Sequence, residues 1–214
     1  MTMAKRDDAL RGLYLITPDT TDSAALLIGV RRALAGRPAL LQYRSKDADA
    51  SLRRRQAAAI AALCREAGVP FIVNDSLELA LAVGADGVHL GRDDGDLRAA
   101  RAALGPERIL GVTCYNEWAR AEEGTAAGAD YVAFGAVFAS PTKPAAVHAP
   151  LELLTRARRE LKLPVAAIGG ITLDNAPQAI AAGADLLAVI SDVFDHPDPG
   201  GRAAAYRAAF GLSG

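Results

Sequence analysis

The architecture is indicated by two neighbouring phrases of the sequence, Phe71-Ile-Val-Asn-Asp75 and Gly87-Val-His-Leu-Gly-Arg-Asp-Asp94. Each is a short apolar run that ends in carboxylates. Between them, residues 77–83 have helical character, and Gly84-Ala-Asp86 places a glycine past the helix end, where a left-handed cap is favoured. The two phrases therefore predict a strand, a helix and a second strand, which is the βαβ unit of a parallel sheet.

The same alternation continues along the whole chain. Gly128-Ala-Asp130 and Gly183-Ala-Asp185 repeat the Gly-Ala-Asp phrase, and we interpret each as a C-cap plus a turn that leads into a strand. The predicted strands cover residues 13–17, 39–44, 71–74, 87–90, 109–114, 131–138, 165–169 and 186–191. The predicted helices cover residues 23–35, 50–67, 77–83, 97–104, 117–127, 151–161, 175–182 and about 202–210. Eight strands, each followed by a helix, predict a closed (β/α)8 TIM barrel.

A doubly wound open sheet is the alternative architecture. It is disfavoured because Leu15-Ile-Thr-Pro-Asp19 stands where such a sheet usually has a Gly-rich turn after its first strand. With 214 residues and 51% hydrophobic content, the chain can bury the core of one larger α/β domain. We expect a single domain over residues 1–214, with residues 1–11 as a flexible or helical N-terminal extension.

Charge and hydropathy exclude several classes of function. The formal net charge is -1 with both signs interspersed, which gives no field that would recruit nucleic acid or an anionic membrane surface. No charged leader precedes an apolar segment, and no apolar run approaches the roughly 20 residues of a membrane span. We therefore expect a soluble, cytoplasmic protein that captures any anionic ligand locally. Cys64 and Cys114 lack metal-ligand spacing and are interpreted as free thiols.

Polar residues follow most of the predicted strands, and in such barrels the carboxyl ends of the strands meet at one rim that carries the chemistry. The strand-end segments that contain them are Gln42, Tyr43, Arg44, Ser45 and Lys46; Asn74 and Asp75; Gly91, Arg92, Asp93 and Asp94; Thr113; Ser140, Pro141, Thr142 and Lys143; Gly169 and Gly170; and Ile190 and Ser191. The coincidence of so many polar residues on one rim predicts a functional site there.

The chemistry of this rim suits phosphate. A phosphate-binding environment with room for two phosphate sites is indicated by three of the cations, Arg44, Lys46 and Lys143, and by the hydroxyls of Ser140, Thr142 and Ser191. The glycine-rich turns after the seventh and eighth predicted strands add exposed backbone N–H groups. Two carboxylates on neighbouring strands would repel a bound phosphate unless a cation lay between them. Mg²⁺ held by one or two carboxylates plus phosphate oxygens meets this need. The acidic residues of the rim therefore predict a magnesium site.

Each acidic residue also has a purely structural interpretation. Asp75 could cap the helix that begins near Leu77, since Asp just before a helix is a common cap. Of Asp93, Asp94 and Asp96, we expect one or two to be solvated turn or capping residues. His89 lies inside a predicted strand, and we interpret it as a hydrogen-bonded interior residue rather than a catalyst.

The cations and glycines of the rim have structural alternatives too. Arg44 and Lys46 could be surface charges, Lys143 could be a solvated loop charge, and Gly169 and Gly170 could form only a tight turn. Their shared position at the strand ends favours the functional interpretation over these.

In this order and spacing, the phrases of the sequence resemble those of thiamine-phosphate synthases over nearly the whole chain, from Gly12 to Ser191. The matching phrases are Leu41-Gln-Tyr-Arg-Ser-Lys46, Val73-Asn-Asp75, Asp86-Gly-Val-His-Leu-Gly91 with Asp94, Gly111-Val-Thr113, Ala129-Asp-Tyr131, Pro141-Thr-Lys143, Ala167-Ile-Gly-Gly-Ile171 and Ala188-Val-Ile-Ser191. Thr113 stands where the family often has Ser, Ser140-Pro-Thr-Lys143 where Thr-x-Thr-Lys is common, and Arg92 where Gln is common.

The resemblance implies a transferase of thiamine biosynthesis that uses Mg²⁺. It would join 4-amino-2-methyl-5-(diphosphooxymethyl)pyrimidine to 4-methyl-5-(2-phosphooxyethyl)thiazole, giving thiamine phosphate and diphosphate. By that likeness, Asp75 and Asp94 bind the metal, and Arg44, Lys46, Thr113 and Lys143 are catalytic. The residues that bind substrate are then Gln42, Tyr43, Arg44, Ser45, Lys46, Asn74, Thr113, Ser140, Pro141, Thr142, Lys143, Gly170, Ile190 and Ser191. The expected partners are the two small-molecule substrates, without nucleic acid or membrane, and the sequence allows a homo-oligomer.

Two other functions fit part of the pattern. One is a thiazole tautomerase-like barrel, which shares the phosphate turns but needs no metal-bound diphosphate. The other is a non-catalytic sensor of a phosphate ligand. Two carboxylates facing a set of cations disfavour both, and the tautomerase is further disfavoured because no His follows Gly111-Val-Thr113.

Overall fold

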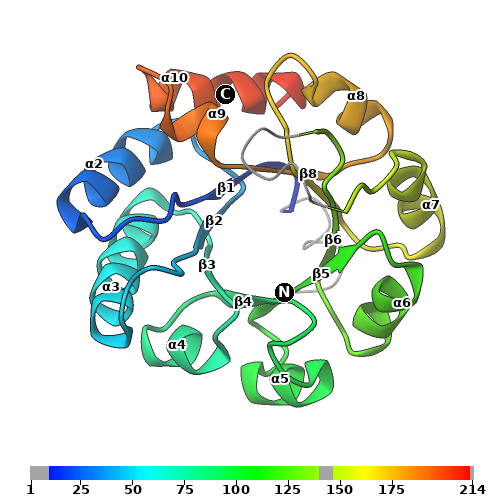
Figure 1. The fold of residues 1–214 in the computed structure, drawn as a ribbon, viewed down its shortest axis with the longest axis horizontal. Helices are drawn as coiled ribbons and strands as arrows, with labels where there is room; N and C mark the ends of the chain where they lie inside the picture. The colour runs from blue at the N-terminus through cyan, green and yellow to red at the C-terminus, as the bar shows by residue number, and fades with distance from the viewer. Residues whose placement is uncertain (1–9, 140–146, 213–214) are drawn as a thin grey trace.

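A computed structural model describes residues 10–139 and 147–212 of the chain. Eight parallel strands form a closed barrel in chain order, and the helices surround it on the outside (Figure 1). This confirms the predicted (β/α)8 fold. The expected N-terminal extension falls mostly outside the described residues, while Leu10 is buried and Arg11 donates a hydrogen bond to the Phe210 carbonyl at 3.0 Å.

The element bounds follow the predicted ones to within a few residues. The strands are β1 (Gly12–Ile16), β2 (Leu40–Tyr43), β3 (Phe71–Asn74), β4 (Gly87–Leu90), β5 (Ile109–Tyr115), β6 (Tyr131–Gly135), β7 (Val165–Ile168) and β8 (Leu186–Val189). The helices are α2 (Ser23–Leu34), α3 (Ala50–Ala67), α4 (Leu77–Ala82), α5 (Leu97–Leu104), α6 (Trp118–Ala126), α7 (Glu152–Glu160), α8 (Ala176–Ala181), α9 (Ser191–Phe194) and α10 (Pro199–Ala209). The sequence did not predict the short helix α9, whose residues follow β8 almost directly.

Capping side chains explain where several helices begin. Asp22 and Asp49 cap α2 and α3, and each accepts a hydrogen bond from a backbone N–H in the first turn. Ser76, not Asp75, caps α4, and Asp96 caps α5. The capping alternative is therefore wrong for Asp75 and correct for Asp96.

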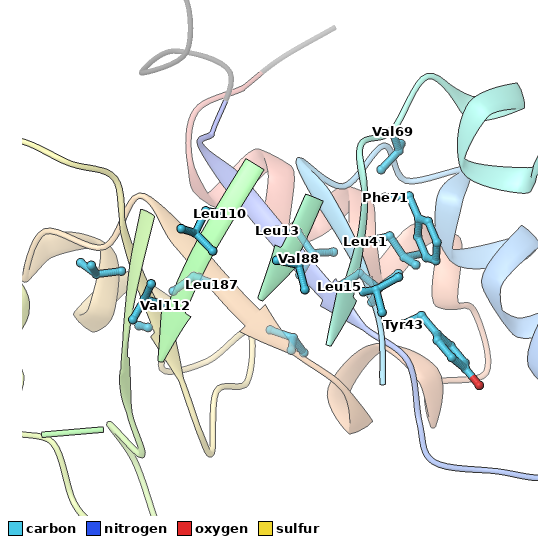
Figure 2. Packing of buried hydrophobic residues seen from close by; sticks show 14 of the residues in the cluster. Leu13, Leu15, Leu41, Tyr43, Val69, Phe71, Val88, Leu110, Val112 and Leu187 are labelled. Carbon is cyan, nitrogen blue, oxygen red and sulfur yellow. The ribbon is translucent and has the colours of Figure 1, made fainter. Parts of the chain in front are cut away.

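Alternation along the strands divides the apolar core into two layers, because successive side chains of a strand point to opposite faces. The larger layer lies between the strands and the helices (Figure 2) and includes Leu13, Leu15, Leu41, Tyr43, Phe71, Val88, Leu110, Val112 and Leu187. The smaller layer includes Tyr14, Ile16, Leu40, Ile72, Tyr131, Ala133, Ala166, Leu186 and Ala188, which alternate with the first set and fill the barrel. Gln42 and His89 are buried and share the strand parity of the second set.

The three Gly-Ala-Asp phrases close the amino-terminal end of the barrel. Their glycines, Gly84, Gly128 and Gly183, all have positive φ, as the C-cap interpretation requires. Their aspartates were not predicted to do more, but each accepts a hydrogen bond from a backbone N–H of the preceding strand. The pairs are Asp86 with Phe71 at 2.8 Å, Asp130 with Leu110 at 2.8 Å and Asp185 with Val165 at 3.0 Å. The phrase thus ties β4 to β3, β6 to β5 and β8 to β7.

Two further expectations concern membrane-spanning helices and the two cysteines. In the described part of the chain, no helix combines the length and apolar character that a membrane span needs. Cys64 and Cys114 are both buried free thiols, as the sequence predicted.

Candidate functional site

Asp75 and Asp94 lie side by side at the carboxyl-terminal ends of β3 and β4. The Asp75 N–H donates to the His89 carbonyl at 2.9 Å, and its φ of 63° lies in the left-handed region, which Asp tolerates better than most residues. Burial and the adjacent Asp94 carboxyl raise the pKa of Asp75 to about 6, while Lys46 and Arg44 act in the opposite sense. Two carboxyl groups and two cations therefore share this part of the rim.

A tight turn fixes Asp94 in this position. The Gly91 N–H donates to Asp94 Oδ2 at 2.6 Å. A Cβ atom at Gly91 would lie 2.9 Å from that oxygen and 3.3 Å from the Tyr115 hydroxyl, so a larger residue would displace the carboxylate. Asp93 is exposed, and Asp96 is engaged in the cap of α5. Of the three acidic residues, it is Asp94 that interacts with Asp75.

The cationic loop after β2 is shaped by Asp19, which follows β1. Asp19 accepts hydrogen bonds from the Lys46 N–H at 3.0 and 2.9 Å, from the Asp47 N–H at 3.2 Å and from the Ser45 hydroxyl at 3.4 Å. It also pairs with Arg44, whose Nη1 is 3.6 Å from Oδ2. The loop therefore takes its shape from contacts within the chain.

Thr17 holds the first residue of the same loop. It is fully buried, and its hydroxyl accepts from the Arg44 N–H at 3.0 Å and donates to the Arg44 carbonyl at 3.2 Å. Sequence reasoning missed both Thr17 and Asp19. The signal that could have found them is the one used for the other strands, because both are polar residues directly after β1.

A chain of hydrogen-bonded side chains crosses the barrel interior from β2 to β5. Gln42 Nε2 donates to the Tyr14 hydroxyl at 2.6 Å, and the hydroxyl oxygens of Tyr14 and Tyr131 are 2.5 Å apart. The Tyr131 hydroxyl is 2.8 Å from His89 Nδ1, and His89 Nε2 is 2.6 Å from Thr113 Oγ1. We call these five residues the interior relay. It links two predicted site residues, Gln42 and Thr113, through three interior residues that were not predicted as site residues.

The relay depends on a glycine in β5, Gly111, which has no side chain to separate Tyr131 from His89. In the strand register His89 lies opposite Gly111, which lies opposite Tyr131. A Cβ atom at Gly111 would lie 2.1 Å from Tyr131 Cζ and 2.6 Å from His89 Nδ1. The glycine of β5 thus lets side chains from β4 and β6 meet across it. Burial lowers the pKa of His89 to about 4, and the structure confirms that His89 is a hydrogen-bonded interior residue.

An irregularity in β5 separates its last side chains. The pairing with β6 shifts between Thr113 and Tyr115, as in a β-bulge. Bulges re-aim side chains near sites. Thr113 contacts His89 in the interior, whereas Tyr115 lies near Gly91 and beneath the Arg92 guanidinium, 5.1 Å from the ring centroid.

The turns after β7 and β8 are rigidly held. Gly170 has a φ of 63°, and a Cβ atom there would lie 2.5 Å from the Ala139 carbonyl oxygen. Asn175 Nδ2 donates to the Gly170 carbonyl at 2.9 Å. Gly169 and Gly170 therefore form a tight turn after β7, and a role of this turn in binding phosphate stays a prediction. The turn also packs against the backbone that leads to residue 140.

Beyond β8, Ile190 precedes α9 and Ser191 is its exposed first residue. Asp192 anchors this short helix: it accepts two hydrogen bonds from Arg202, at 3.0 and 2.8 Å, and one from the Tyr206 hydroxyl at 2.5 Å. The predicted phosphate-binding residues Ile190 and Ser191 therefore lie on a firmly anchored segment.

Not all predicted site residues come together. Ser140, Pro141, Thr142 and Lys143 lie outside the described residues. Tyr43 was predicted to bind substrate, but strand alternation places it on the helix-facing side of β2, with Leu41 and Phe71 (Figure 2). Its hydroxyl donates to Gln56 Oε1 of α3 at 2.7 Å, away from the barrel interior. The structure thus gives the Tyr43 side chain a packing position, and the place of this residue among the substrate-binding residues stays a prediction.

The predicted site does not coincide with the two cavities at the other end of the barrel. These have volumes of about 360 and 700 Å³ and are lined by residues at the amino-terminal ends of the strands, among them Gly12, Ala39, Val69, Ala85 and Ile109. None of the predicted site residues that the structure describes lines either cavity. In barrels of this type the chemistry lies at the opposite, carboxyl-terminal rim.

The sequence matches a known family model. Residues 13–193 match the family model described as thiamine monophosphate synthase. A thiamine-phosphate synthase of Aromatoleum aromaticum is 77% identical over 204 residues, covering 95% of this chain and 98% of the relative. A thiamine-phosphate synthase of an Azoarcus species is 64% identical over 203 residues, with the same coverage of both chains.

One solved structure supports the same relationship, and a second shares the fold. A thiamine phosphate pyrophosphorylase from Pyrococcus furiosus superposes with a TM-score of 0.84 at 34% identity, covering 98% of this chain and all of the other. A 3-hexulose-6-phosphate synthase superposes with a TM-score of 0.67 at 20% identity, covering 93% of this chain and 99% of the other. The second likeness concerns the barrel alone.

Proposed function

Because this chain belongs to the thiamine monophosphate synthase family, we propose that its carboxyl-terminal rim joins a hydroxymethylpyrimidine diphosphate to a thiazole phosphate. The chain is a transferase of thiamine biosynthesis, and its product is thiamine phosphate. The observation that carries the assignment of the site is the carboxylate pair Asp75 and Asp94 beside the cations of the loop after β2.

The carboxylate pair fits a magnesium ion. Burial first, and then the adjacent Asp94 carboxyl, raise the pKa of Asp75 to about 6. Two adjacent carboxylates resist double ionisation, and a divalent cation beside them would relieve that repulsion. Within residues 10–139 and 147–212, no group of three or more His, Cys, Asp or Glu side chains is arranged to hold a metal. The remaining ligands would then be diphosphate oxygens and water, as is usual for Mg²⁺. When bound, Mg²⁺ would supply positive charge to the departing diphosphate.

The cationic loop would stabilise the same leaving group. Arg44 and Lys46 would face the diphosphate, and Thr17 and Asp19 would hold the loop that carries them in place. Donors that are already oriented cost no reorganisation when charge develops, which is the main source of electrostatic catalysis. Lys143 would join them.

The interior side of the site would orient the pyrimidine. Gln42 donates its amide N–H to Tyr14, so its carbonyl oxygen is the group that can accept from the amino group of the pyrimidine. Asn74, at the end of β3 and opposite His89 in the register, would contact the diphosphate. No protein nucleophile is required. The C–O bond to diphosphate breaks first, and the thiazole nitrogen then forms the C–N bond while the site holds the two partners together.

The turns after β7 and β8 would receive the phosphate of the thiazole. Gly170 brings its turn against the segment that leads to residue 140, and Asp192 anchors α9 behind Ile190 and Ser191. Ser140, Pro141 and Thr142 would complete this second phosphate site. A second phosphate site, distinct from the diphosphate site, is what a two-substrate condensation requires.

A product assay tests the function. The purified chain is mixed with both substrates and Mg²⁺, and diphosphate and thiamine phosphate are measured together. We expect equal amounts of the two products, a requirement for both substrates, and loss of turnover when a chelator removes the metal. Diphosphate release without thiamine phosphate, or no release at all, would contradict the proposal.

A further inference from the structure

The interior relay has a direction that can be worked out from its atoms. The amide nitrogen of Gln42 can only donate, so the Tyr14 hydroxyl accepts there and has its own hydrogen to give. Its partner for that hydrogen is the Tyr131 oxygen, 2.5 Å away. Tyr131 in turn gives its hydrogen to His89 Nδ1 at 2.8 Å. Each hydroxyl then accepts one hydrogen bond and donates one.

This direction fixes the tautomer of His89. If Nδ1 accepts from Tyr131, the ring hydrogen of the neutral imidazole lies on Nε2 and points to Thr113 Oγ1 at 2.6 Å. The other tautomer would make Nδ1 a donor to Tyr131, and Tyr131 would then donate to Tyr14. Tyr14 would receive two hydrogens and keep its own without an acceptor, which is costly at a fully buried site.

The last step concerns the hydroxyl of Thr113. With His89 as its donor, Thr113 Oγ1 accepts, and its own hydrogen has no acceptor among the described residues. Thr113 is partly exposed at the end of β5, on the rim that carries Asp75 and Asp94. The relay therefore begins at the Gln42 carbonyl oxygen and ends at the Thr113 hydroxyl hydrogen, and neither has a side-chain partner within residues 10–139 and 147–212.

We propose that His89 is a positioning residue which, as the Nε2–H tautomer, fixes the Thr113 hydroxyl as a hydrogen-bond donor toward an anionic oxygen of the ligand. This inference rests on the proposed function only in taking that oxygen to belong to the leaving diphosphate. An anionic oxygen accepts but cannot donate, so a Thr113 hydroxyl turned toward His89 would offer it only a lone pair.

Two features of the structure support this role. Gly111 leaves the gap through which Tyr131 reaches His89, so the sequence of β5 is compatible with the contact that sets the tautomer. His89 is buried, and its two ring nitrogens face two hydroxyls, so a neutral ring that accepts at Nδ1 and donates from Nε2 satisfies both contacts. A charged ring would donate from both nitrogens and would reverse the direction of the relay at Tyr131.

Nitrogen NMR of the free protein tests the tautomer without any assay of activity. Long-range ¹H–¹⁵N correlation spectra of the full ¹⁵N-labelled chain at pH 7 distinguish Nε2–H, Nδ1–H and charged imidazole. The signals of the three histidines are assigned with His89→Gln, His148→Gln and His196→Gln, of which the last two change exposed side chains. We expect His89 as the neutral Nε2–H form. An Nδ1–H or charged His89 would overturn the proposal.

Removing the donor to His89 tests the cause. Tyr131→Phe keeps the ring but deletes the hydroxyl that donates to Nδ1, so we expect its spectrum to show a mixture of the two neutral forms. An unchanged Nε2–H signal in a variant that remains folded by circular dichroism would show that Tyr131 does not set the tautomer and would overturn the relay.

A double-mutant cycle connects the tautomer to turnover. We expect Thr113→Val to lower kcat on the order of 10²-fold, as for loss of one oriented donor, and His89→Leu to lower it by ~10-fold or more. In the Thr113→Val background, His89→Leu should change kcat less than about 2-fold, because its target is gone. Equal losses in both backgrounds would contradict action through Thr113. If the wild type forms no product while the NMR result holds, the proposed function fails and the relay stands.

Discussion

At the scale of single residues, the decisive observation is that Asp75 is not a helix cap. The sequence allowed Asp75 either to cap α4 or to belong to a metal site, and both alternatives fit its position. In the structure Ser76 takes the cap, and the side chain of Asp75 lies against Asp94. A one-residue difference in cap position thus releases a carboxylate for the rim.

The raised pKa of Asp75 predicts how stability depends on pH. Its pKa is about 6 in the folded protein and 3.8 ordinarily, so between these values the folded state binds a proton that the unfolded state has released. The resulting stabilisation is complete below about pH 3.8 and is lost as the pH rises through 6. In metal-free buffer, we expect the difference in unfolding free energy between wild type and Asp75→Asn to shift against the wild type from pH 4 to 7.

Urea unfolding at several pH values measures this difference. The lowered pKa of His89 acts with the opposite sign, but it is present in both proteins and cancels in the comparison. Asp93→Asn is the matched control, since Asp93 is exposed beside the same turn. A pH-independent difference for Asp75→Asn, or an equal trend for Asp93→Asn, would disagree with the carboxylate pair.

Several site residues could not be found from the sequence because they act through partners that are far away along the chain. Tyr14 and Tyr131 are 117 positions apart, and Gln42 and Tyr14 are 28 apart. Either tyrosine alone looks like an ordinary core aromatic. Only the closure of the barrel, which sets β1 and β6 around one shared interior, places their hydroxyls together.

At the scale of elements, the Gly-Ala-Asp phrase is the most informative unit. Sequence reasoning assigned the glycine correctly from its place after a helix. It did not assign the aspartate, because the partner of that side chain is a backbone N–H of another strand. Every residue except proline has a backbone N–H, so the amino-acid sequence does not show which one is the partner. The same contact occurs before β4, β6 and β8, so the repeat reflects a structural device as well as a turn.

Asp185 allows this device to be tested, because it is the most buried of the three. Asp185→Ala leaves the buried Val165 N–H without its side-chain acceptor, and we expect a loss of about 1–3 kcal/mol in unfolding free energy. Asp185→Asn retains an oxygen that can accept, so its loss should be smaller. Urea denaturation with a common m-value provides the comparison.

The paired cation supplies the control for this test. Arg158 also contacts Asp185, but its side chain is largely exposed, and exposed pairs contribute roughly 0–1 kcal/mol. Arg158→Ala should therefore cost much less than Asp185→Ala. If the two cost the same, the ion pair and not the backbone contact would be the source of the stability.

At the scale of the whole molecule, the barrel turns scattered sequence signals into one site. The period of apolar runs and helical segments was sufficient to predict eight strands and their order, because parallel strands in a closed barrel follow the chain. Gathering the strand ends onto one rim then followed from the fold. For Tyr43 the rim alone was not enough to place the side chain: the residue is next to Gln42, so strand alternation points its side chain to the helix-facing side.

The central claim is that Asp94, beside Asp75 and the cations of the rim, holds the metal needed for diphosphate release. The most direct measurement is kcat as a function of Mg²⁺ concentration for wild type, Asp94→Asn and Asp93→Asn. Asn at position 94 keeps an oxygen for the Gly91 N–H, so the turn is preserved while a charged ligand is lost. We expect Asp94→Asn to lower kcat on the order of 10²-fold and to need more Mg²⁺, while Asp93→Asn behaves as wild type. Unchanged turnover in Asp94→Asn, or equal losses in both variants, would contradict the account.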